Sequence, residues 1–256
     1  MEYHLKKSLG QHFLHDEDIA LAIVNMMHPA PGLRLLEVGP GGGALTKYLL
    51  ELPNIEYKAV EIDKEKVLWL RKNFPAIEGK IIEADVLEMR LPFEGMFSII
   101  GNFPYNISSQ ILFLVLEWQE QVETVVGMFQ REVAKRIASG PGSKEYGILS
   151  VLMQAFYDVE YLLDVPPTAF TPPPKVMSGV VRFAKNSNPH NITDRKIFKR
   201  LVKAAFNQRR KTLRNALRGT LPEAALTTEP LMSKRAEQLS VAQFADLYHR
   251  YLTGND

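Results

Sequence analysis

Short apolar runs alternate with segments of helical spacing through the first half of this chain. The runs are too short for buried helices, and most of them end at glycine, asparagine or an acidic residue. Apolar residues between the runs recur three and four positions apart, as they do on one face of a helix. Strands that alternate with helices predict a mostly parallel sheet with both faces covered. The predicted strands lie at residues 33–38, 57–63, 80–85, 97–102 and 124–129.

The pattern changes after Phe183. A polar, turn-forming stretch at 184–191 is followed only by helical periodicity. We therefore expect an α/β domain at residues 1–185 and a small all-helical domain at 191–256.

Composition excludes several classes of protein and site. The chain has 256 residues and no cysteine, which excludes disulfides, cysteine nucleophiles and cysteine-ligated metals. It contains no apolar stretch of the roughly 20 residues needed to span a membrane, and no apolar segment follows the basic N-terminus. We expect a cytoplasmic monomer without a membrane contact. His12 and His15 have no third ligand nearby in the sequence, so no metal is expected.

The first predicted strand ends in a glycine-rich turn that suits a nucleotide. Gly39 and Gly41, with Ala44 three residues later, fit the loose form of the dinucleotide fingerprint. Glu61 ends the next strand, where a carboxylate can accept both ribose hydroxyls. Two cofactors fit this corner, a nicotinamide dinucleotide or S-adenosylmethionine. Asp85, at the end of the third strand, would accept from an adenine amino group or cap a helix.

The motif Asn102-Phe103-Pro104-Tyr105 follows the fourth strand, at the sheet edge where ligands bind. It resembles the signature of the S-adenosylmethionine-dependent adenine-N6 methyltransferases, which favours that cofactor. An exocyclic amino group is a poor nucleophile, and the Asn102 oxygen with the carbonyl of Phe103 or Pro104 could accept its two hydrogens. Tyr105 offers a ring for an unstacked base. The alternative is an ordinary loop with turn residues and core aromatics.

Two further segments resemble the ribosomal RNA adenine dimethyltransferases. Residues 9–14 are similar to the N-terminal segment that covers the cofactor, which implies cofactor contacts from His12 and Leu14. The proline-rich segment 166–178 resembles the late motif whose aromatic packs against the extruded base, here Phe170. The alternatives are a solvated histidine and a structural connector with Phe170 in the core.

Residues 194–218 hold ten lysines and arginines against one acid, Asp194, so they carry +9 in a chain whose net charge is +2. With Phe198 and Phe206 interleaved, this composition is typical of a phosphate-binding surface. The stretch 206–215 resembles the bacterial dimethyltransferases of small-subunit rRNA, which implies RNA contacts from a short basic group: Arg209, Arg210, Lys211 and Arg214.

The resemblance implies a Rossmann-like class I S-adenosylmethionine methyltransferase sheet with a helical C-terminal domain. The implied reaction dimethylates N6 of two adjacent adenosines in a hairpin loop near the 3′ end of 16S rRNA, within the immature 30S subunit. Three alternatives remain at this point. They are a 23S rRNA adenine methyltransferase of the macrolide-resistance type, an NAD(P) oxidoreductase, and a non-catalytic assembly factor.

Overall fold

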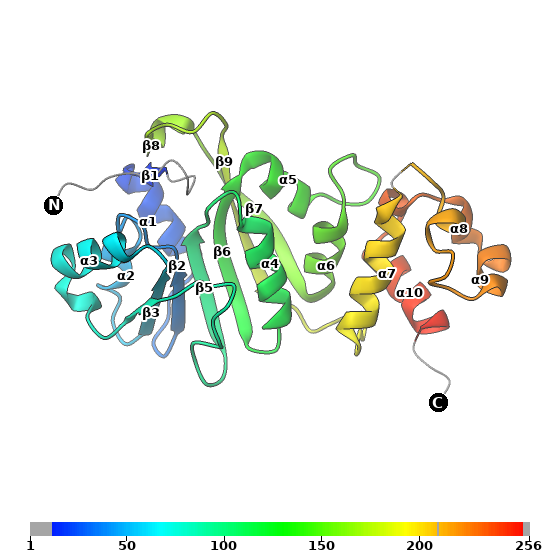
Figure 1. Ribbon diagram of the computed structural model, residues 1–256, viewed down its shortest axis with the longest axis horizontal. Helices are drawn as coiled ribbons and strands as arrows, with labels where there is room; N and C mark the ends of the chain where they lie inside the picture. Colours follow the sequence, from blue (N-terminus) through cyan, green and yellow to red (C-terminus); the bar gives the residue numbers. More distant parts are fainter. Residues whose placement is uncertain (1–11, 209, 253–256) are drawn as a thin grey trace. The chain divides into compact units, whose positions relative to one another are not determined.

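A seven-stranded sheet is the central element of the structure, a computed structural model that describes residues 12–208 and 210–252 (Figure 1). Its strand order is β4-β3-β2-β5-β6-β9-β7. The first five of these strands pair in parallel, as predicted, whereas β9 runs antiparallel to β6. The bounds are β2 Arg34–Val38, β3 Glu56–Glu61, β4 Ile81–Glu83, β5 Phe97–Asn102, β6 Val122–Gln130, β7 Tyr157–Val165 and β9 Ser178–Lys185.

The central strands are apolar on both faces because both faces are covered. Leu35 and Ile100 belong to a buried cluster that also contains Ile23 of helix α1 (Glu17–Met26). Successive strand residues point to opposite faces, so Leu36 and Ile99 face the other side, and both are at most 1% exposed. This explains the near-continuous apolar runs of the sequence.

Helices follow the parallel strands as the alternation predicts. They are α2 (Thr46–Leu49), α3 (Lys64–Asn73) and α4 (Ser108–Glu117), and α4 lies in front of the sheet in Figure 1. Asp63 caps α3 by accepting a hydrogen bond from the Glu65 amide at 3.1 Å. The helix expected over residues 44–50 is shorter than predicted, because residues 41–45 form turns.

A second, two-stranded sheet joins distant parts of the sequence. β1 (Phe13–Leu14) pairs antiparallel with β8 (Phe170–Thr171), with Leu14 opposite Phe170. A 3-10 turn at Pro167–Ala169 precedes β8, and the His15 amide donates to the Ala169 carbonyl at 3.0 Å. The proline-rich segment is thus fastened to the N-terminal segment.

The chain divides into two compact units. One contains residues 1–134 and 160–185, which include most of the sheet. The other contains residues 135–159 and 186–256, so a stretch that precedes the last strands groups with the C-terminal helices. The sequence pattern gives no sign of this grouping. The expected domain boundary between residues 185 and 191 stays a prediction.

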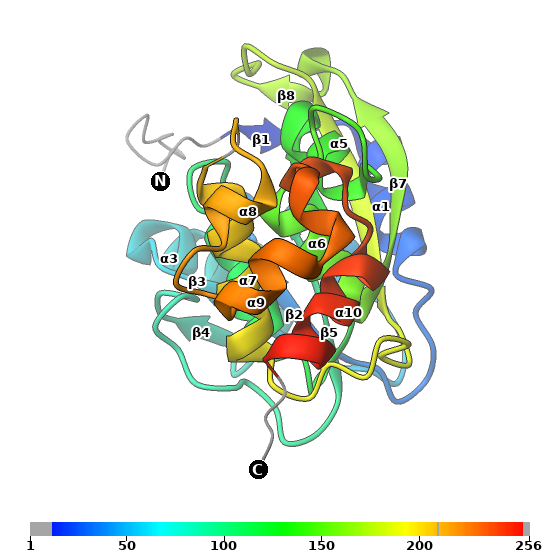
Figure 2. The same ribbon diagram turned by 90° about the vertical axis from the view of Figure 1, so that its right-hand side faces the viewer.

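Aromatic residues form the core of the second unit. Helix α7 (Arg195–Asn207) packs against α6 (Ile148–Phe156) and α10 (Val241–Tyr251), and Figure 2 shows these helices together with α8 (Leu213–Ala216) and α9 (Glu223–Thr228). Phe198 of α7 meets Phe156 and Tyr248 edge-on, with ring centroids 6.4 and 5.9 Å away. Helix α5 (Arg131–Ala138) spans the boundary between the units in sequence.

Within the described ranges, no helix combines the length and apolarity that crossing a membrane requires.

Candidate active site

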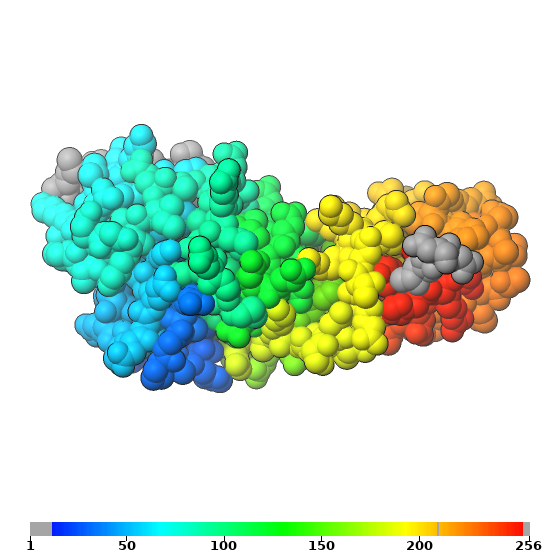
Figure 3. Space-filling view, turned by 90° about the horizontal axis from the view of Figure 1, so that it is seen from below, coloured from blue at the N-terminus to red at the C-terminus, as the bar shows by residue number. Residues whose placement is uncertain are grey.

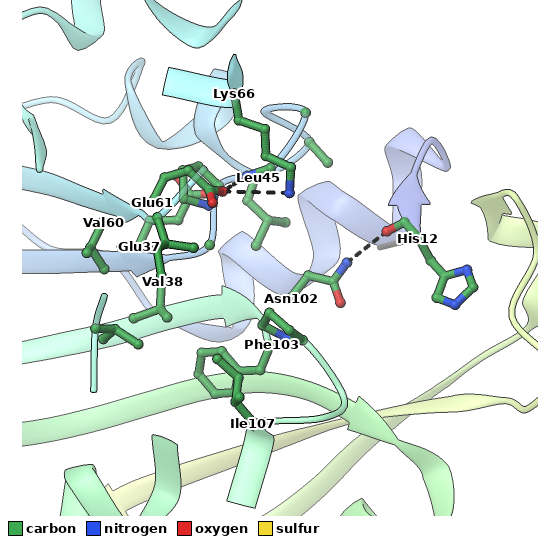
Figure 4. A pocket seen from close by; sticks show the side chains of 18 of the residues that line it. His12, Glu37, Val38, Leu45, Val60, Glu61, Lys66, Asn102, Phe103 and Ile107 are labelled. Atoms are coloured by element: carbon green, nitrogen blue, oxygen red, sulfur yellow. Dashed lines mark hydrogen bonds and ion pairs between the residues drawn. The ribbon is translucent and has the colours of Figure 1, made fainter. Parts of the chain in front are cut away.

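A cavity of about 220 Å³ lies at the carboxyl ends of the parallel strands (Figure 4). The polar or glycine residues at or just after the ends of β2, β3, β4 and β5 line it, namely Gly39, Glu61, Asp85 and Asn102. This is the edge at which open α/β sheets bind ligands. The cavity brings together most of the residues singled out from the sequence: His12, Leu14, Gly39, Gly41, Ala44, Glu61, Asp85, Asn102, Pro104 and Tyr105.

The glycine turn after β2 has a backbone that only glycine adopts easily. Gly39, Gly41 and Gly43 have φ values of 68°, 57° and 84°, in the left-handed region that side chains disfavour. The Gly41 amide points at the next strand and donates to Glu61 Oε2 at 3.2 Å. The turn and the acid predicted from their spacing are therefore in direct contact.

Glu61 is buried and has a cationic neighbour that the sequence analysis did not single out. Its side chain is 5% exposed, and Oε1 accepts from the Asp63 amide at 3.0 Å. Lys66 of α3 places Nζ 3.9 Å from Glu61 Oε2, with only 9% of its side chain exposed (Figure 4). Lysine is almost never buried without a partner. We interpret Lys66 as the counter-ion of Glu61 in this cavity.

A second buried carboxylate, Glu37 of β2, also lines the cavity. It accepts hydrogen bonds from the hydroxyls of Thr46 at 2.8 Å and Tyr57 at 2.5 Å. Burial raises the pKa of Glu37 to about 7, against the opposing effect of these two donors, and the nearby charge of Glu61 raises it further. The sequence analysis treated this residue only as part of a strand, because its burial depends on packing.

Asp85 and Ile62 also line the cavity. Asp85 Oδ1 accepts from the Leu87 amide at 2.9 Å, so the acid caps a turn and lines the cavity at the same time. Ile62 follows Glu61 directly, yet 57% of it is exposed. A large apolar residue left exposed beside two acids indicates a surface for a flat apolar group. In the sequence, the signal for this surface was the isoleucine directly after Glu61, the acid that ends β3.

The Asn102–Tyr105 segment turns away from the end of β5 at the edge of the cavity. Asn102 Nδ2 lies 3.5 Å from the His12 carbonyl oxygen, within reach of a long hydrogen bond, so Oδ1 is the atom left to accept from a ligand (Figure 4). The Pro104 carbonyl accepts the Ile107 amide at 3.1 Å. Tyr105 is fixed through a 2.6 Å hydrogen bond between its hydroxyl and Ser178 Oγ. Burial raises the pKa of Tyr105, so this hydroxyl stays neutral near pH 7.

The N-terminal segment reaches the cavity through its backbone and one aromatic ring. The His12 ring is directed away from Asn102 (Figure 4), and its Nδ1 lies 2.8 Å from the Pro172 carbonyl oxygen. Phe13 covers the glycine turn so closely that a Cβ on Gly42 would lie 2.3 Å from its ring. Residues 9–11 of the predicted motif lie outside the described residues.

Phe170 does not line the cavity. It is 2% exposed and belongs to the same buried cluster as Leu14 and Ile23. The structure therefore places it where the alternative interpretation did, in the core. A role against an extruded base stays a prediction.

Of the four predicted RNA contacts, Arg210 and Lys211 are exposed and Arg209 lies outside the described residues. Arg214 Nε donates to the Leu226 carbonyl at 3.0 Å, so part of its guanidinium has a structural role. Phe198 and Phe206 are 0% and 9% exposed, which assigns these two rings to the core of the second unit.

Residues 12–208 and 210–252 contain no group of three or more histidines, aspartates and glutamates that could hold a metal ion.

The sequence matches the family described as "Ribosomal RNA adenine dimethylase" over residues 3–252. It is 51% identical over 245 residues to "Ribosomal RNA small subunit methyltransferase A" of Cytophaga hutchinsonii, covering 94% of this chain and 95% of that one. Among solved structures, a dimethyladenosine transferase from Plasmodium falciparum has a TM-score of 0.81 at 24% identity, covering 93% of this chain and 96% of that one. The 23S rRNA methyltransferase ErmE has a TM-score of 0.70 at 24% identity, covering 93% and 100%. These two structures share the predicted class I methyltransferase fold.

Proposed function

Since the chain belongs to the ribosomal RNA adenine dimethylase family, we propose that it dimethylates N6 of two adjacent adenosines in a hairpin loop near the 3′ end of 16S rRNA. The methyl donor is S-adenosylmethionine, and each base receives two methyl groups. The observation that carries the proposal is the position of Asn102 and Tyr105 at the edge of a cavity that also holds Gly41, Glu61 and Asp85.

The cavity fits S-adenosylmethionine, whose sulfonium supplies an electrophilic methyl group. The left-handed turn at Gly39 and Gly41 lets a ligand approach the backbone. Glu61, fixed by two amide donors, is placed to accept ribose hydroxyls. Asp85 and Ile62 offer an acceptor and an apolar surface to an adenine ring. Leu14 and the backbone of His12 close the cavity on the N-terminal side.

The target amino group would be held by two acceptors. Asn102 Oδ1 is one, since Nδ2 of the same amide lies toward His12. The Phe103 carbonyl is favoured as the second, because the Pro104 carbonyl already accepts the Ile107 amide. Two acceptors orient the nitrogen lone pair toward the methyl group, so positioning supplies much of the catalysis. Pro104 stiffens the turn, and Tyr105 presents its ring to the base.

The remaining assignments follow from the same proposal. Residues 1–185 carry out methyl transfer and 191–256 bind RNA, with contacts from Arg209, Arg210, Lys211 and Arg214. The substrate is 16S rRNA within the immature 30S subunit, and the enzyme acts as a cytoplasmic monomer. Phe170 would pack against the base only after leaving its present site in the core.

A methylation assay tests the proposed substrate. Purified protein with S-adenosylmethionine should convert unmethylated 30S subunits to product that contains N6,N6-dimethyladenosine in 16S rRNA, detected by mass spectrometry after nuclease digestion. Protein-free 23S rRNA serves as the competing substrate. Dimethyladenosine in 23S rRNA alone, or in neither RNA, would contradict the proposal.

Replacing Gly42 with alanine should weaken cofactor binding. The new Cβ would overlap the Phe13 ring at 2.3 Å, so the ring must shift from its place over the glycine turn, and we expect it to disturb the cover of the cavity. Gly42 has no positive φ, so the backbone itself accepts alanine. We expect the dissociation constant of S-adenosylhomocysteine to rise about tenfold, which is about 1.4 kcal/mol. Calorimetry in wild-type and Phe13→Ala backgrounds provides the check. If Gly42→Ala has the same effect without the Phe13 ring, the explanation is wrong.

Replacing Lys66 with methionine should raise the KM for S-adenosylmethionine about tenfold and leave kcat within about twofold, as expected for an interaction made equally in ground and transition states. Methionine removes the ammonium 3.9 Å from Glu61 but keeps an unbranched side chain. Lys66→Arg should restore most of the affinity, and Lys72→Met, exposed on the same helix, is the matched control. Steady-state kinetics at saturating RNA make the measurement. A fall in kcat at unchanged KM would contradict the counter-ion role.

A further inference from the structure

Ser178 is a polar side chain at a fully buried position of the central sheet. It is 0% exposed and begins β9, opposite Gln130 of β6. Strand positions of this kind favour apolar residues, and a buried hydroxyl needs a hydrogen-bond partner. Among the residues that the structure describes, the Ser178 hydroxyl has one partner, the Tyr105 hydroxyl at 2.6 Å. Tyr105 lines the cavity and Ser178 does not, so this bond links the sheet to the cavity wall.

The backbone around Ser178 is held on both sides. The Arg131 amide donates to the Met177 carbonyl at 2.9 Å, directly before Ser178. Directly after it, a Cβ at Gly179 would lie 2.6 Å from the Tyr161 hydroxyl oxygen, so Tyr161 packs against the strand itself. Groups built on strands are placed more precisely than groups on loops. Ser178 is therefore a fixed anchor for the side chain that it binds.

Tyr105 belongs to the turn after β5 and is held at three points. Its carbonyl accepts from Ser108 Oγ at 3.1 Å, which fixes the backbone. Its ring lies 5.9 Å from the His12 ring between centroids, with the planes tilted by 33°. The third contact is the bond from Ser178 to the hydroxyl. Because the hydroxyl lies on the long axis of the ring, this bond fixes where the ring points, while His12 limits its rotation about that axis.

We propose that Ser178 is a positioning residue for methyl transfer, which fixes the Tyr105 ring in the orientation that receives the target base. It rests on the proposed function, since that function gives the ring its base. A ring fixed before the base arrives loses little further freedom on binding, and the target amino group then meets its acceptor on Asn102 in a productive geometry.

A purely structural role for the hydroxyl pair has different consequences. In that case the two groups only satisfy each other's hydrogen bonding. Removing one of them leaves the other buried without a partner and costs stability, whereas replacing both with apolar groups of the same shape is nearly neutral. The double replacement Tyr105→Phe/Ser178→Ala therefore restores a structural role but not a positioning role.

The test is a cycle of Ser178→Ala, Tyr105→Phe and the double variant. Single-turnover methyl transfer to unmethylated 30S subunits would be measured at saturating cofactor and substrate. We expect each single variant to be about fivefold slower than wild type, the effect of one ordinary neutral hydrogen bond. The double variant should be as slow as either single variant, because all three lack the same bond. The dissociation constant of S-adenosylhomocysteine should change by less than about twofold, since the ring itself is kept.

Stability measurements and a matched variant separate positioning from folding. Urea unfolding should show a loss of stability in each single variant and its recovery in the double variant. Ser98→Ala removes a hydroxyl from another buried strand position, the second residue of β5. Ser98 lies toward the end of β5 away from Asn102, and Figure 3 views the molecule from that end of the parallel strands. Ser98→Ala should transfer methyl groups at the wild-type rate.

A double variant that regains the wild-type rate would overturn the proposal, because its ring would then be positioned without Ser178. So would a wild-type rate in Ser178→Ala, or effects of the two single variants that multiply in the double variant, because the shared bond would then not be their cause. Failure of the proposed function would look different, since wild type itself would then yield no dimethyladenosine in 30S subunits.

Discussion

Asn102→Ala is expected to reduce kcat for methyl transfer to 30S subunits by about 10²- to 10³-fold, the usual effect of removing one positioned hydrogen-bond partner from a reacting group. The variant removes Oδ1, the acceptor for the target amino group. It also removes Nδ2, which lies 3.5 Å from the His12 carbonyl. The measurement is single-turnover transfer of a labelled methyl group at saturating cofactor and substrate.

Two variants make the Asn102 result specific. Asn102→Asp keeps an acceptor at the same place and should retain more activity than alanine. Asn73→Ala is the control: it changes an exposed asparagine of α3 whose Nδ2 donates to the Trp69 carbonyl. This variant should transfer methyl groups at the wild-type rate. RNA binding by Asn102→Ala should be unaffected, which separates catalysis from assembly-factor binding. A kcat within threefold of wild type would show that Asn102 does not position the amino group.

Local signals were sufficient to predict the parallel half of the sheet and most of the cavity. Strands such as β2 and β5 are short apolar runs that end in glycine or asparagine, and parallel pairing brings their carboxyl ends to one edge. Gly41, Glu61 and Asn102 were therefore expected to meet, and the structure places all three in one cavity.

The missed elements depend on long-range pairing or packing. β9 follows the proline-rich segment and pairs antiparallel with β6, which no local pattern specifies. The grouping of residues 135–159 with the C-terminal helices likewise depends on tertiary contacts.

Burial was the main source of error at individual residues. Phe206 stands among cations in the sequence, yet the helical period of α7 carries it into the core, 9% exposed. Lys66 is one of two lysines near the start of α3, and only the tertiary structure shows that it, unlike exposed Lys64, reaches Glu61. Composition identifies the kind of surface, but periodicity and packing decide which residues form it.

Gly101→Ala should lower the free energy of unfolding of the first unit by about 3 kcal/mol, at the upper end of the usual effect of overpacking a core. A Cβ at this position in β5 would lie 2.5 Å from the Val38 carbonyl oxygen and 2.7 Å from the Phe103 ring. The ring is 1% exposed and packs edge-on against Phe129 with centroids 5.3 Å apart, so it has little room to move. The Val38 carbonyl belongs to the backbone of β2 and can shift only by disturbing the β2–β5 pairing.

Urea unfolding followed by tryptophan fluorescence measures this change in the relevant part of the chain, because both tryptophans, Trp69 and Trp118, belong to the first unit. Gly140→Ala, which lies in the second unit, controls for the replacement of a glycine and should leave this transition unchanged. Nothing lies within 4 Å of a Cβ there and its φ is not positive, so we expect a change within about 0.5 kcal/mol.

A Gly101→Ala/Phe103→Leu variant separates the two contacts. Because leucine removes the ring but leaves the Val38 carbonyl in place, we expect it to recover only a minor part of the loss. Full recovery would make the ring the dominant contact, and an unchanged stability of Gly101→Ala would contradict the close approach of β2 and β5 beneath the cavity.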